Sequence, residues 1–494
     1  MKSDLHDLQL LLDSKVPILV IASYEEPRVL EMLTDLAVTR TLPLFVWSIT
    51  DGLNRLGFGE KPEEGDKLDD CGVLEAIKAD STPSLYVLCD FHPYLKGEPR
   101  NIRLLREIAM HHNQLGHTVV LLSHQIELPN EVKRYSARFE LSMPTEEQLM
   151  HLVREEASAW STSQGGVPVR SSSDTFKKLV QNLKGVSIED ARQLVRAAIY
   201  DDGVIDDSDI PEMNKAKFAL MDMEGVLSFQ YDTAEFGEVG GLVKLKEWLE
   251  RRQDSFLESD TAMDAPKGIM LLGVQGGGKS LAAKAVAGMW SLPLLRLDFG
   301  ALYNKYHGET ERNLREALKL ADMMSPCVLW LDEIEKGIST SQSDSGISAR
   351  VLGTLLTWMS ERRSKAFIVA TSNDISQLPP ELVRKGRLDE IFFVDLPKHG
   401  IRKDIFRIHL EKRSQDPMHF DLTTLANISD GFSGAEIEQV IVSALYCVAA
   451  SDAELSMSAL QEAIQGTNPL SVVMEEKIHQ LRDWATERCV FADE

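Results

Sequence analysis

Short apolar runs alternate with longer amphipathic stretches over the first 200 residues. Runs rich in β-branched and other apolar residues predict strands, and stretches with helical spacing of apolar residues predict helices between them. The predicted strands are 16–22, 44–49, 85–89, 119–122 and 139–141, and a typical predicted helix is 102–112. This alternation predicts an α/β domain with a parallel sheet.

The second half repeats the α/β pattern over 268–397 and then changes to purely helical spacing from Ile401 onward. Between the halves, residues 201–215 read DDGVIDDSDIPEMNK, which is acidic and contains turn formers and a proline. Such a segment is typical of a linker. The resulting division of the chain is an α/β domain with a small helical part (1–200), an acidic linker (201–230), a large α/β subdomain (231–398), and a helical lid and tail (399–494).

The two halves resemble each other in two places, and in the same order. The segment TVVLLSHQIELP from Thr118 runs parallel to AFIVATSNDISQLPP from Ala366, and GVSIEDARQLVRAAI from Gly185 matches GFSGAEIEQVIVSAL from Gly431. Internal similarity of this kind indicates a repeated module. We therefore expect residues 1–200 to be a degenerate copy of the second-half module, with an unrelated α/β domain as the alternative.

The clearest chemical motif is a glycine-rich loop between a predicted strand and a predicted helix. Residues 273–280 read GVQGGGKS and fit G-x-x-x-x-G-K-[ST], the phosphate-binding loop of nucleotide-binding proteins. Its glycines let backbone N–H groups converge on phosphate oxygens, while Lys279 reaches the terminal phosphates and Ser280 ligates magnesium. We expect ATP and Mg²⁺ as cofactors. The candidate nucleotide-binding residues here are Gly273, Val274, Gln275, Gly276, Gly277, Gly278, Lys279, Ser280 and Leu281.

Two later strand ends carry groups suited to hydrolysis. The run VLWLDE, residues 328–333, predicts a buried strand that ends in two carboxylates. That ending is common by itself, but its distance from the phosphate loop favours a part of the same site. Asp332 is then expected to hold magnesium through water, and Glu333 to orient and deprotonate the attacking water. Asn373 follows the next strand and is the candidate sensor of the terminal phosphate.

These motifs occur in the order seen in AAA ATPases, which the chain resembles from about Phe236 to Ala449. The two-part layout also resembles an uncharacterised AAA family first seen as a hypothetical chloroplast reading frame and present in bacteria. The resemblance implies a P-loop AAA module, with a parallel sheet and a helical lid, that assembles into a ring, usually a hexamer. It also assigns nucleotide contacts to Val239, Gly240 and Gly241 at the adenine, to His409 near the ribose, and to Gly434 and Ala435 in the lid.

In such a ring, Arg384 and Arg387 of VRKGRLDE would act on a neighbour's ATP as catalytic residues, although the residues alone equally fit two surface arginines. Tyr306 and His307 stand where family members carry a pore loop that contacts a threaded polypeptide. His307 replaces the usual aliphatic residue, and a tyrosine packed under a loop is the alternative reading of Tyr306. Lys385 replaces the proline usual between the two arginines.

The composition of the chain limits the kinds of partner that it is expected to bind. The chain has 53 Lys and Arg against 77 Asp and Glu, a formal charge of -24, which disfavours nucleic acid. Its five cysteines form no C-x-x-C pair, so no zinc site is indicated. No run reaches membrane-spanning length, so we expect a cytoplasmic protein without a transmembrane segment. Residues 23–28 read SYEEPR and lack a Gly-Lys pair, so the first half should not bind nucleotide.

Two functional hypotheses follow. The first is a homo-oligomeric, ring-forming ATPase that remodels or unfolds a protein substrate. The second is an ATP-controlled assembly switch or scaffold whose N-terminal domain recruits a partner. A nucleic-acid motor is disfavoured by the negative charge.

Overall fold

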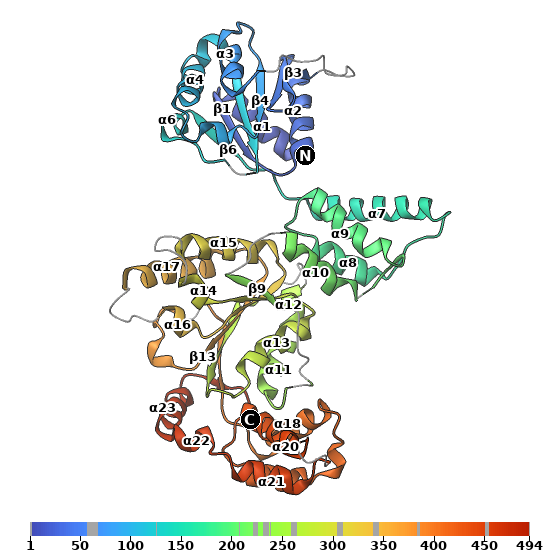
Figure 1. Ribbon diagram of the computed structural model, residues 1–494, viewed down its shortest axis with the longest axis vertical. Coiled ribbons are helices and arrows are strands. Elements are labelled where there is room, and N and C mark those ends of the chain that lie inside the picture. The colour runs from blue at the N-terminus through green and yellow to red at the C-terminus, as the bar shows by residue number, and fades with distance from the viewer. Residues whose placement is uncertain are drawn as a thin grey trace. The chain divides into compact units, whose positions relative to one another are not determined.

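The computed structural model describes residues 2–56, 68–124, 126–206, 208–220, 226–230, 237, 239–257, 264–303, 310–338, 345–382, 386–449 and 454–493. The chain forms two compact units, Met1–Met143 and Pro144–Glu494 (Figure 1). Each unit has its own sheet and its own hydrophobic core.

The first unit is built on a six-stranded sheet in the order β3-β2-β4-β5-β1-β6. Every neighbouring pair is parallel except β2 and β3. The strands are β1 (Ile18–Ala22), β2 (Leu44–Ser48), β3 (Gly52–Leu56), β4 (Leu85–Cys89), β5 (Thr118–Ser123) and β6 (Ser136–Phe139). The strand predicted at 139–141 begins three residues earlier, at Ser136. The prediction was displaced because this edge strand contains Ser136 and Arg138 and has no continuous apolar run.

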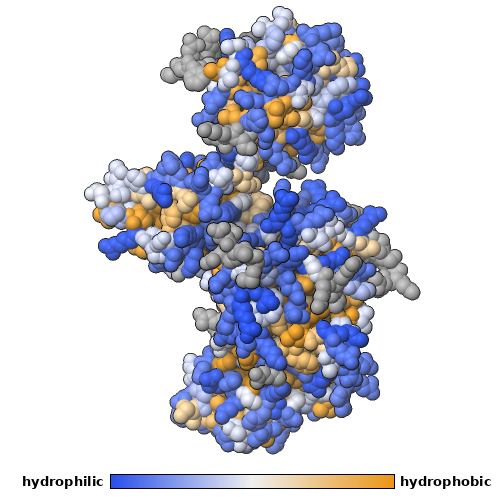
Figure 2. All heavy atoms as spheres, turned by 180° about the vertical axis from the view of Figure 1, so that it is seen from behind, coloured by the Kyte–Doolittle hydropathy of each residue, from blue (hydrophilic) through white to orange (hydrophobic). Residues whose placement is uncertain are grey.

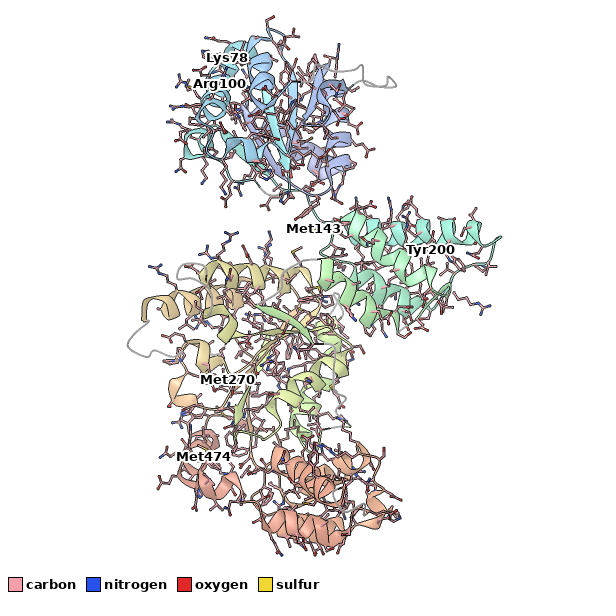
Figure 3. The ribbon with its side chains drawn as sticks, in the orientation of Figure 1. Lys78, Arg100, Met143, Tyr200, Met270 and Met474 are labelled. Carbon is pink, nitrogen blue, oxygen red and sulfur yellow. The ribbon has the colours of Figure 1, made fainter. Side chains whose placement is uncertain are left out.

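Helices cover both faces of this sheet. They are α1 (Lys2–Asp13), α2 (Glu26–Arg40), α3 (Asp70–Ala79), α4 (Pro99–Met110), α5 (His112–Leu115) and α6 (Asn130–Lys133), with a short 3-10 helix η1 (His92–Leu95). Alternate residues of β1 enter opposite cores: Ile18 packs with α3 and α4, and Leu19 packs with α1 and α2. Lys78 and Arg100, labelled in Figure 3, join α3 and α4 on the outside through ion pairs to Glu107 (2.8 Å) and Glu75 (2.7 Å).

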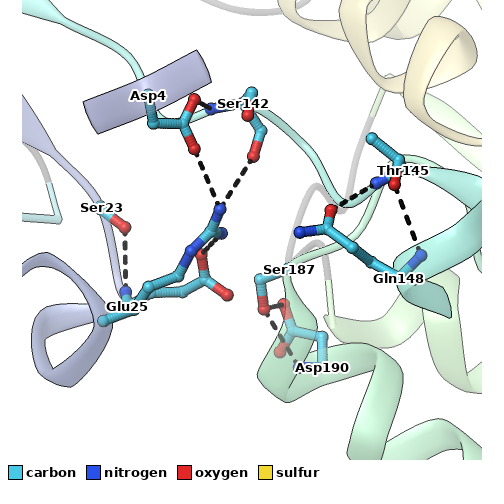
Figure 4. A network of polar contacts seen from close by, with 9 residues as sticks. Asp4, Ser23, Glu25, Ser142, Thr145, Gln148, Ser187 and Asp190 are labelled. Carbon is cyan, nitrogen blue, oxygen red and sulfur yellow. Dashed lines mark hydrogen bonds and ion pairs between the residues drawn. The ribbon is translucent and has the colours of Figure 1, made fainter. Parts of the chain in front are cut away.

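The second unit begins with a helical group that has its own core. It consists of α7 (Glu146–Ser163), α8 (Ser173–Asn182), α9 (Ile188–Tyr200) and α10 (Asp209–Leu220), with a small pair of strands, β7 (Arg170–Ser171) and β8 (Val204–Ile205). Capping residues fix the helix starts: Thr145 and Gln148 form a capping box at α7, and the Ser187 hydroxyl accepts from the Asp190 N–H at α9 (Figure 4).

A seven-stranded sheet follows, in the order β15-β14-β10-β13-β12-β11-β9. All pairs are parallel except β9 with β11. The strands are β9 (Leu227–Gln230), β10 (Gly268–Gly273), β11 (Leu294–Leu297), β12 (Cys327–Leu331), β13 (Ala366–Ser372), β14 (Glu390–Val394) and β15 (Val490–Phe491). Met270 of β10, labelled in Figure 3, is fully buried in the core.

The helices beside this sheet precede a helical lid and tail. Those of the sheet are α11 (Val243–Glu250), α12 (Gln253–Leu257), α13 (Lys279–Trp290), α14 (Phe299–Tyr303), α15 (Thr310–Met323), α16 (Ile334–Ile338) and α17 (Ser345–Glu361), with η3 (Ile375–Gln377). Those of the lid and tail are α18 (His399–Glu411), η4 (Pro417–His419), α19 (Leu422–Ile428), α20 (Gly434–Ala449), α21 (Met457–Gln465), α22 (Leu470–Val473) and α23 (Glu475–Thr486).

The two sheets share one strand order. In chain order, the first parallel strand lies between the fourth and the fifth in both: β1 between β5 and β6, and β10 between β13 and β14. The two internally similar segments also coincide structurally, because β5 corresponds to β13, and Gly185 and Gly431 both have positive φ just before α9 and α20. The expected fold, an α/β module with a helical lid preceded by a related α/β domain, is therefore present.

The segment that we expected to be an acidic linker, 201–230, contains regular structure. Within it lie β8, α10 and β9. Ile210 and Met213 of α10 are buried in the core of the helical group, and Leu227 of β9 is buried against the second sheet. These buried apolar residues hold the segment in place, although its first nine residues include five aspartates.

Among the described residues, no helix is long and apolar enough to cross a membrane. Figure 2 shows hydrophilic residues over most of the face that it draws, as the strong negative charge leads one to expect.

Candidate nucleotide-binding site

The glycine-rich loop lies where the sequence predicts it. Strand β10 ends at Gly273 and α13 begins at Lys279, so the loop joins the carboxyl end of a central parallel strand to a helix N-terminus. Gly276 and Gly278 have φ values of +76° and +95°, a region that side chains disfavour. A Cβ at Gly276 would lie 2.9 Å from the Ser433 hydroxyl oxygen, so this position also needs a glycine for space.

Lys279 is buried beneath the loop. Its side chain is 7% exposed, and its Nζ donates to the carbonyl oxygens of Gly273 (2.9 Å) and Val274 (2.8 Å). Burial lowers the pKa of Lys279 to about 8, although nearby carboxylates, chiefly that of Glu335, oppose the shift. An anion such as a phosphate beside this amine would favour its charged form.

Asp332 follows the last residue of β12 and is fixed by two neighbours. Its Oδ2 lies 2.8 Å from the Arg296 guanidinium, and its Oδ1 accepts a hydrogen bond of 2.8 Å from the Thr371 hydroxyl. The same hydroxyl oxygen accepts from the backbone N–H of Glu333 at 3.0 Å. Thr371 therefore aligns the acidic pair, a role that sequence reasoning did not assign to it.

Glu333 and Asn373 are in direct contact. The Asn373 amide nitrogen donates to Glu333 Oε1 at 3.0 Å, and Lys336 forms an ion pair with the other oxygen of the same carboxylate. The Asn373 backbone N–H donates to Oε1 of Glu335 at 2.9 Å. Glu335 is 5% exposed, and its Oε2 has no hydrogen-bond partner among the described residues. The candidate base and the candidate sensor thus share one hydrogen-bonded corner of the sheet.

A cavity of about 480 Å³ collects most of the predicted residues, a size suited to a small ligand. The predicted residues that line it are Val239, Gly240, Gln275, Gly276, Gly277, Gly278, Lys279, Ser280, Leu281, Asp332, Glu333, Asn373, His409, Gly434 and Ala435. One end of the cavity is formed by the phosphate loop and the carboxylates. Apolar side chains of α18, in the lid, line another part of the cavity.

Some predicted residues do not line this cavity. They are Gly241, Gly273, Val274 and Arg387. Gly241 lies directly beside the lining residues, and the Gly273 and Val274 carbonyls accept from Lys279. The Arg387 guanidinium donates to the Glu381 carbonyl instead. Arg384, Tyr306 and His307 lie outside the described residues, so their expected roles stay predictions.

Sequence reasoning missed other lining residues, which are Leu242, Thr371, Val394, Asp395, Pro397, Ile401, Ile405, Ile408, Glu438 and Asp493. The three isoleucines follow helical spacing on α18, and that signal was available in the sequence. Glu438 of α20 pairs with Arg413 at 2.8 Å and lies 3.6 Å from His409. Burial lowers the pKa of His409. Asp493 lies far from the motif residues along the chain, and no local pattern predicts its position.

Two polar groups of the cavity are of the kind that can hold a magnesium ion. The described residues contain no cluster of three or more His, Cys, Asp and Glu that forms a complete metal site. Magnesium usually takes one or two protein oxygen ligands beside phosphate oxygens and water. The Ser280 hydroxyl and the Asp332 carboxylate, both on the cavity wall, are oxygen donors of this kind.

A phosphate loop at the start of α13, an acidic pair at the end of a neighbouring parallel strand, and a helical lid over both define the class of P-loop nucleotide-binding proteins. Comparison with known families narrows this class. Residues 269–396 match the ATPase family associated with various cellular activities (AAA). Residues 4–141 match the N-terminal domain of SpoVK-like AAA ATPases, and residues 147–224 match their second domain.

Individual relatives agree with these matches. The uncharacterized AAA domain-containing protein ycf46 of Pyropia yezoensis is 34% identical over 97% of both chains, and that of Trieres chinensis is 32% identical over 97% of this chain and 96% of its own. A proteasome-activating nucleotidase of Aeropyrum pernix is 34% identical over 43% of this chain and 54% of its own. The chain belongs to the AAA ATPase family and shares its full-length layout with the ycf46 proteins.

Proposed function

We propose that the chain binds ATP with Mg²⁺ in this cavity, hydrolyses the ATP, and works as a ring-forming protein remodeller or unfoldase. Membership of an ATPase family supports the hydrolysis. The observation that carries the proposal is that Lys279, Asp332, Glu333 and Asn373, from three different segments, line one cavity that also has an apolar part.

In this proposal the polar end of the cavity holds the phosphates. The loop N–H groups and the Lys279 amine bind phosphate oxygens, and Ser280 and Asp332 hold the metal, the latter through water. Bound Mg²⁺ would neutralise charge on the phosphates. Glu333 accepts a proton from the attacking water, and Asn373, which already donates to Glu333 at 3.0 Å, keeps that carboxylate oriented.

The apolar end would hold the nucleoside. Val239, Gly240, Ile401 and Ile405 all line the cavity, which gives a purine aliphatic surface to pack against. A Cβ at Gly240 would lie 2.7 Å from a side-chain carbon of Ile405, so the two walls already approach closely. His409, Gly434 and Ala435 complete this end from the lid, near the expected ribose.

Assembly into a homo-oligomeric ring, usually a hexamer in this family, would complete the site. Arg387 does not line the nucleotide cavity of its own subunit, which is consistent with a role, together with Arg384, at the ATP of a neighbouring subunit. Similarity over 43% of the chain to a proteasome-activating nucleotidase supports action on proteins, with Tyr306 and His307 as the pore loop.

The first unit supports the second candidate function, an ATP-controlled switch or scaffold. At the end of β1, where a phosphate loop would lie, the Arg28 guanidinium binds Glu25 (2.6 Å) and Asp4 (3.2 Å), and Asp4 also accepts from the Ser142 N–H at 3.3 Å (Figure 4). The guanidinium at this position is thus already held by two carboxylates, and no lysine stands beside it to bind phosphate. The unit therefore suits partner recruitment better than nucleotide binding.

The test is to measure ATP turnover and particle mass together across a range of protein concentrations. We expect turnover that rises as particles assemble, a loss of about 10³-fold or more in Arg384→Ala and Arg387→Ala, and no change in the exposed control Arg251→Ala. Tyr306→Ala should lower the stimulation of turnover by an added unfolded protein. Concentration-independent turnover by a monomer would contradict the ring, and turnover indifferent to Tyr306 and to unfolded protein would favour the switch.

A further inference from the structure

The last described residues of the chain are built into the nucleotide-binding subdomain. Strand β15 joins the sheet beside β14, with Val490 paired to Phe392. The Ala492 N–H donates to the Phe393 carbonyl at 2.9 Å, and the Ala492 carbonyl accepts from the Lys244 N–H at 3.0 Å. Ala492 is fully buried, and the rings of Phe491 and Phe393 lie 5.3 Å apart. This part of the tail is therefore a fixed structural element.

Asp493 comes next, and it lines the cavity. Its Oδ1 accepts a hydrogen bond from the backbone N–H of Leu242, at the start of α11, where no side chain of the helix itself provides a cap. A Cβ at Gly241 would lie 2.8 Å from the same carboxylate oxygen. The carboxylate thus touches the 239–242 segment, which forms the apolar end of the cavity.

The chemistry of this carboxylate is specific. An ionised carboxylate only accepts hydrogen bonds, and its two oxygens offer about four acceptor positions in total. Backbone N–H groups of Leu242 and Val243 use part of that capacity, and Asp493 also lines the cavity. Burial raises the pKa of Asp493, which reflects the partial loss of water around the carboxylate. A desolvated acceptor gains most from a ligand that brings an N–H group to it.

We propose that Asp493 selects the base: its carboxylate accepts a hydrogen bond from the exocyclic amino group of adenine and disfavours purines with a carbonyl oxygen at that position. This inference rests on the proposed function, because it needs the nucleotide to place its base at the apolar end. Asp493 is then a specificity-determining residue, and it lies 251 residues along the chain from Leu242, from whose N–H it accepts a hydrogen bond.

ADP and inosine diphosphate test this proposal well. ADP has an amino group where inosine diphosphate has a carbonyl oxygen, and neither nucleotide supports ATP hydrolysis. Calorimetric titration with Mg²⁺ should show that the wild-type protein prefers ADP by about tenfold or more. In Asp493→Asn the side-chain oxygen can still accept from Leu242, but the amide can also donate to a carbonyl oxygen. We expect this variant to prefer ADP by no more than about threefold, and Asp493→Ala should show a similarly small preference.

The preference ratio separates recognition from structure. If Asp493 only caps α11, both nucleotides weaken together in the variants and the ratio stays at its wild-type value, which would overturn the proposal. Glu487→Gln, an equal loss of charge on an exposed residue of the same tail, should leave both affinities unchanged. A wild-type protein that binds both diphosphates equally also overturns it. A wild-type protein that binds neither overturns the proposed nucleotide site itself.

Discussion

Lys217 should make the stability of the second unit depend on pH. This lysine of α10 is 1% exposed, and its Nζ donates to the carbonyl oxygens of Asn182 (2.8 Å) and Lys184 (2.5 Å), at the end of α8. Burial lowers the pKa of Lys217 from 10.5 to about 7. The folded protein therefore releases a proton that the unfolded chain retains between these two values.

The sign and the size follow from proton linkage. Where the unfolded chain binds more protons than the folded one, the free energy of unfolding rises with pH, by about 1.4 kcal/mol per pH unit for one full proton. Above a pH of about 7.5, the unfolded chain binds most of one proton more at Lys217 than the folded protein does. From pH 7.5 to 9 the wild type should gain about 2 kcal/mol from this residue alone. The gain ends as the pH approaches the unfolded pKa of 10.5.

Urea unfolding of wild type and Lys217→Met at pH 7.5 and 9, followed by circular dichroism, measures this gain. Subtracting the variant from the wild type cancels the titration of other groups. Lys215→Met provides the matched control, because Lys215 lies on the same helix with its side chain exposed. We expect the control to follow the wild type. Identical pH dependence in wild type and Lys217→Met would show that Lys217 keeps its charge in the folded protein and would refute the reasoning.

Three further predictions concern the site and the backbone. Glu333→Gln should bind ATP normally and release phosphate at least about 100-fold more slowly, and undiminished turnover would exclude Glu333 as the base. Glu335→Ala removes the acceptor of the Asn373 N–H and should lower kcat about tenfold with little change in KM, whereas Glu335→Gln keeps an acceptor and should restore most of it; equal losses in both variants would contradict a positioning role. Gly185→Ala should destabilise the fold by about 2 kcal/mol or more, because Gly185 has a φ of +84° and its added Cβ would lie 2.2 Å from a backbone carbonyl at the end of α15. Gly166→Ala, at a φ of +94° with no neighbour within 4 Å, should cost less, and equal melting temperatures would refute the steric argument.

Much of the fold could be predicted from local patterns. The central strands are short apolar runs buried on both faces, as in LYVLC of β4, and such runs are recognisable without any partner. The edges were harder, because β6 is mixed in polarity and β9 lies within an acidic segment. Both depend on pairing with a distant strand, β1 in one case and β11 in the other. Local sequence carries little information about such pairs.

The candidate site divides in the same way. The phosphate loop could be found from the sequence because phosphate binding requires particular residues at the fixed positions of its pattern. Asp332 and Glu333 could be found from their position at a strand end. Asp493 could not, because its carboxylate reaches the cavity only through the pairing of β15 with β14. Thr371 was overlooked for another reason. A threonine near a strand end is ordinary, and its role is visible only from its hydrogen bonds with Asp332 and Glu333.

Both units have a carboxylate and a hydroxyl hydrogen-bonded to each other at the ends of two adjacent strands. The comparison distinguishes what the fold requires from what catalysis requires. In the first unit Cys89 pairs with Leu122, and the residues that follow these two, Asp90 and Ser123, form a hydrogen bond of 2.6 Å. In the second unit the corresponding positions are Asp332 and Thr371, with a hydrogen bond of 2.8 Å. The acid and its hydroxyl therefore occupy one register in both sheets.

This pair persists in a unit that lacks the other groups of the site. After β1 there is no counterpart of Lys279, and after Asp90 the chain has Phe91, a buried core residue, where the second unit has Glu333. A hydroxyl bound to a carboxylate can join two adjacent strand ends without any nucleotide, so we infer that the pair has a structural role in both units. Removing the Thr371 hydroxyl should then disturb the strand end as well as the chemistry, whereas removing the Glu333 carboxylate should disturb the chemistry alone.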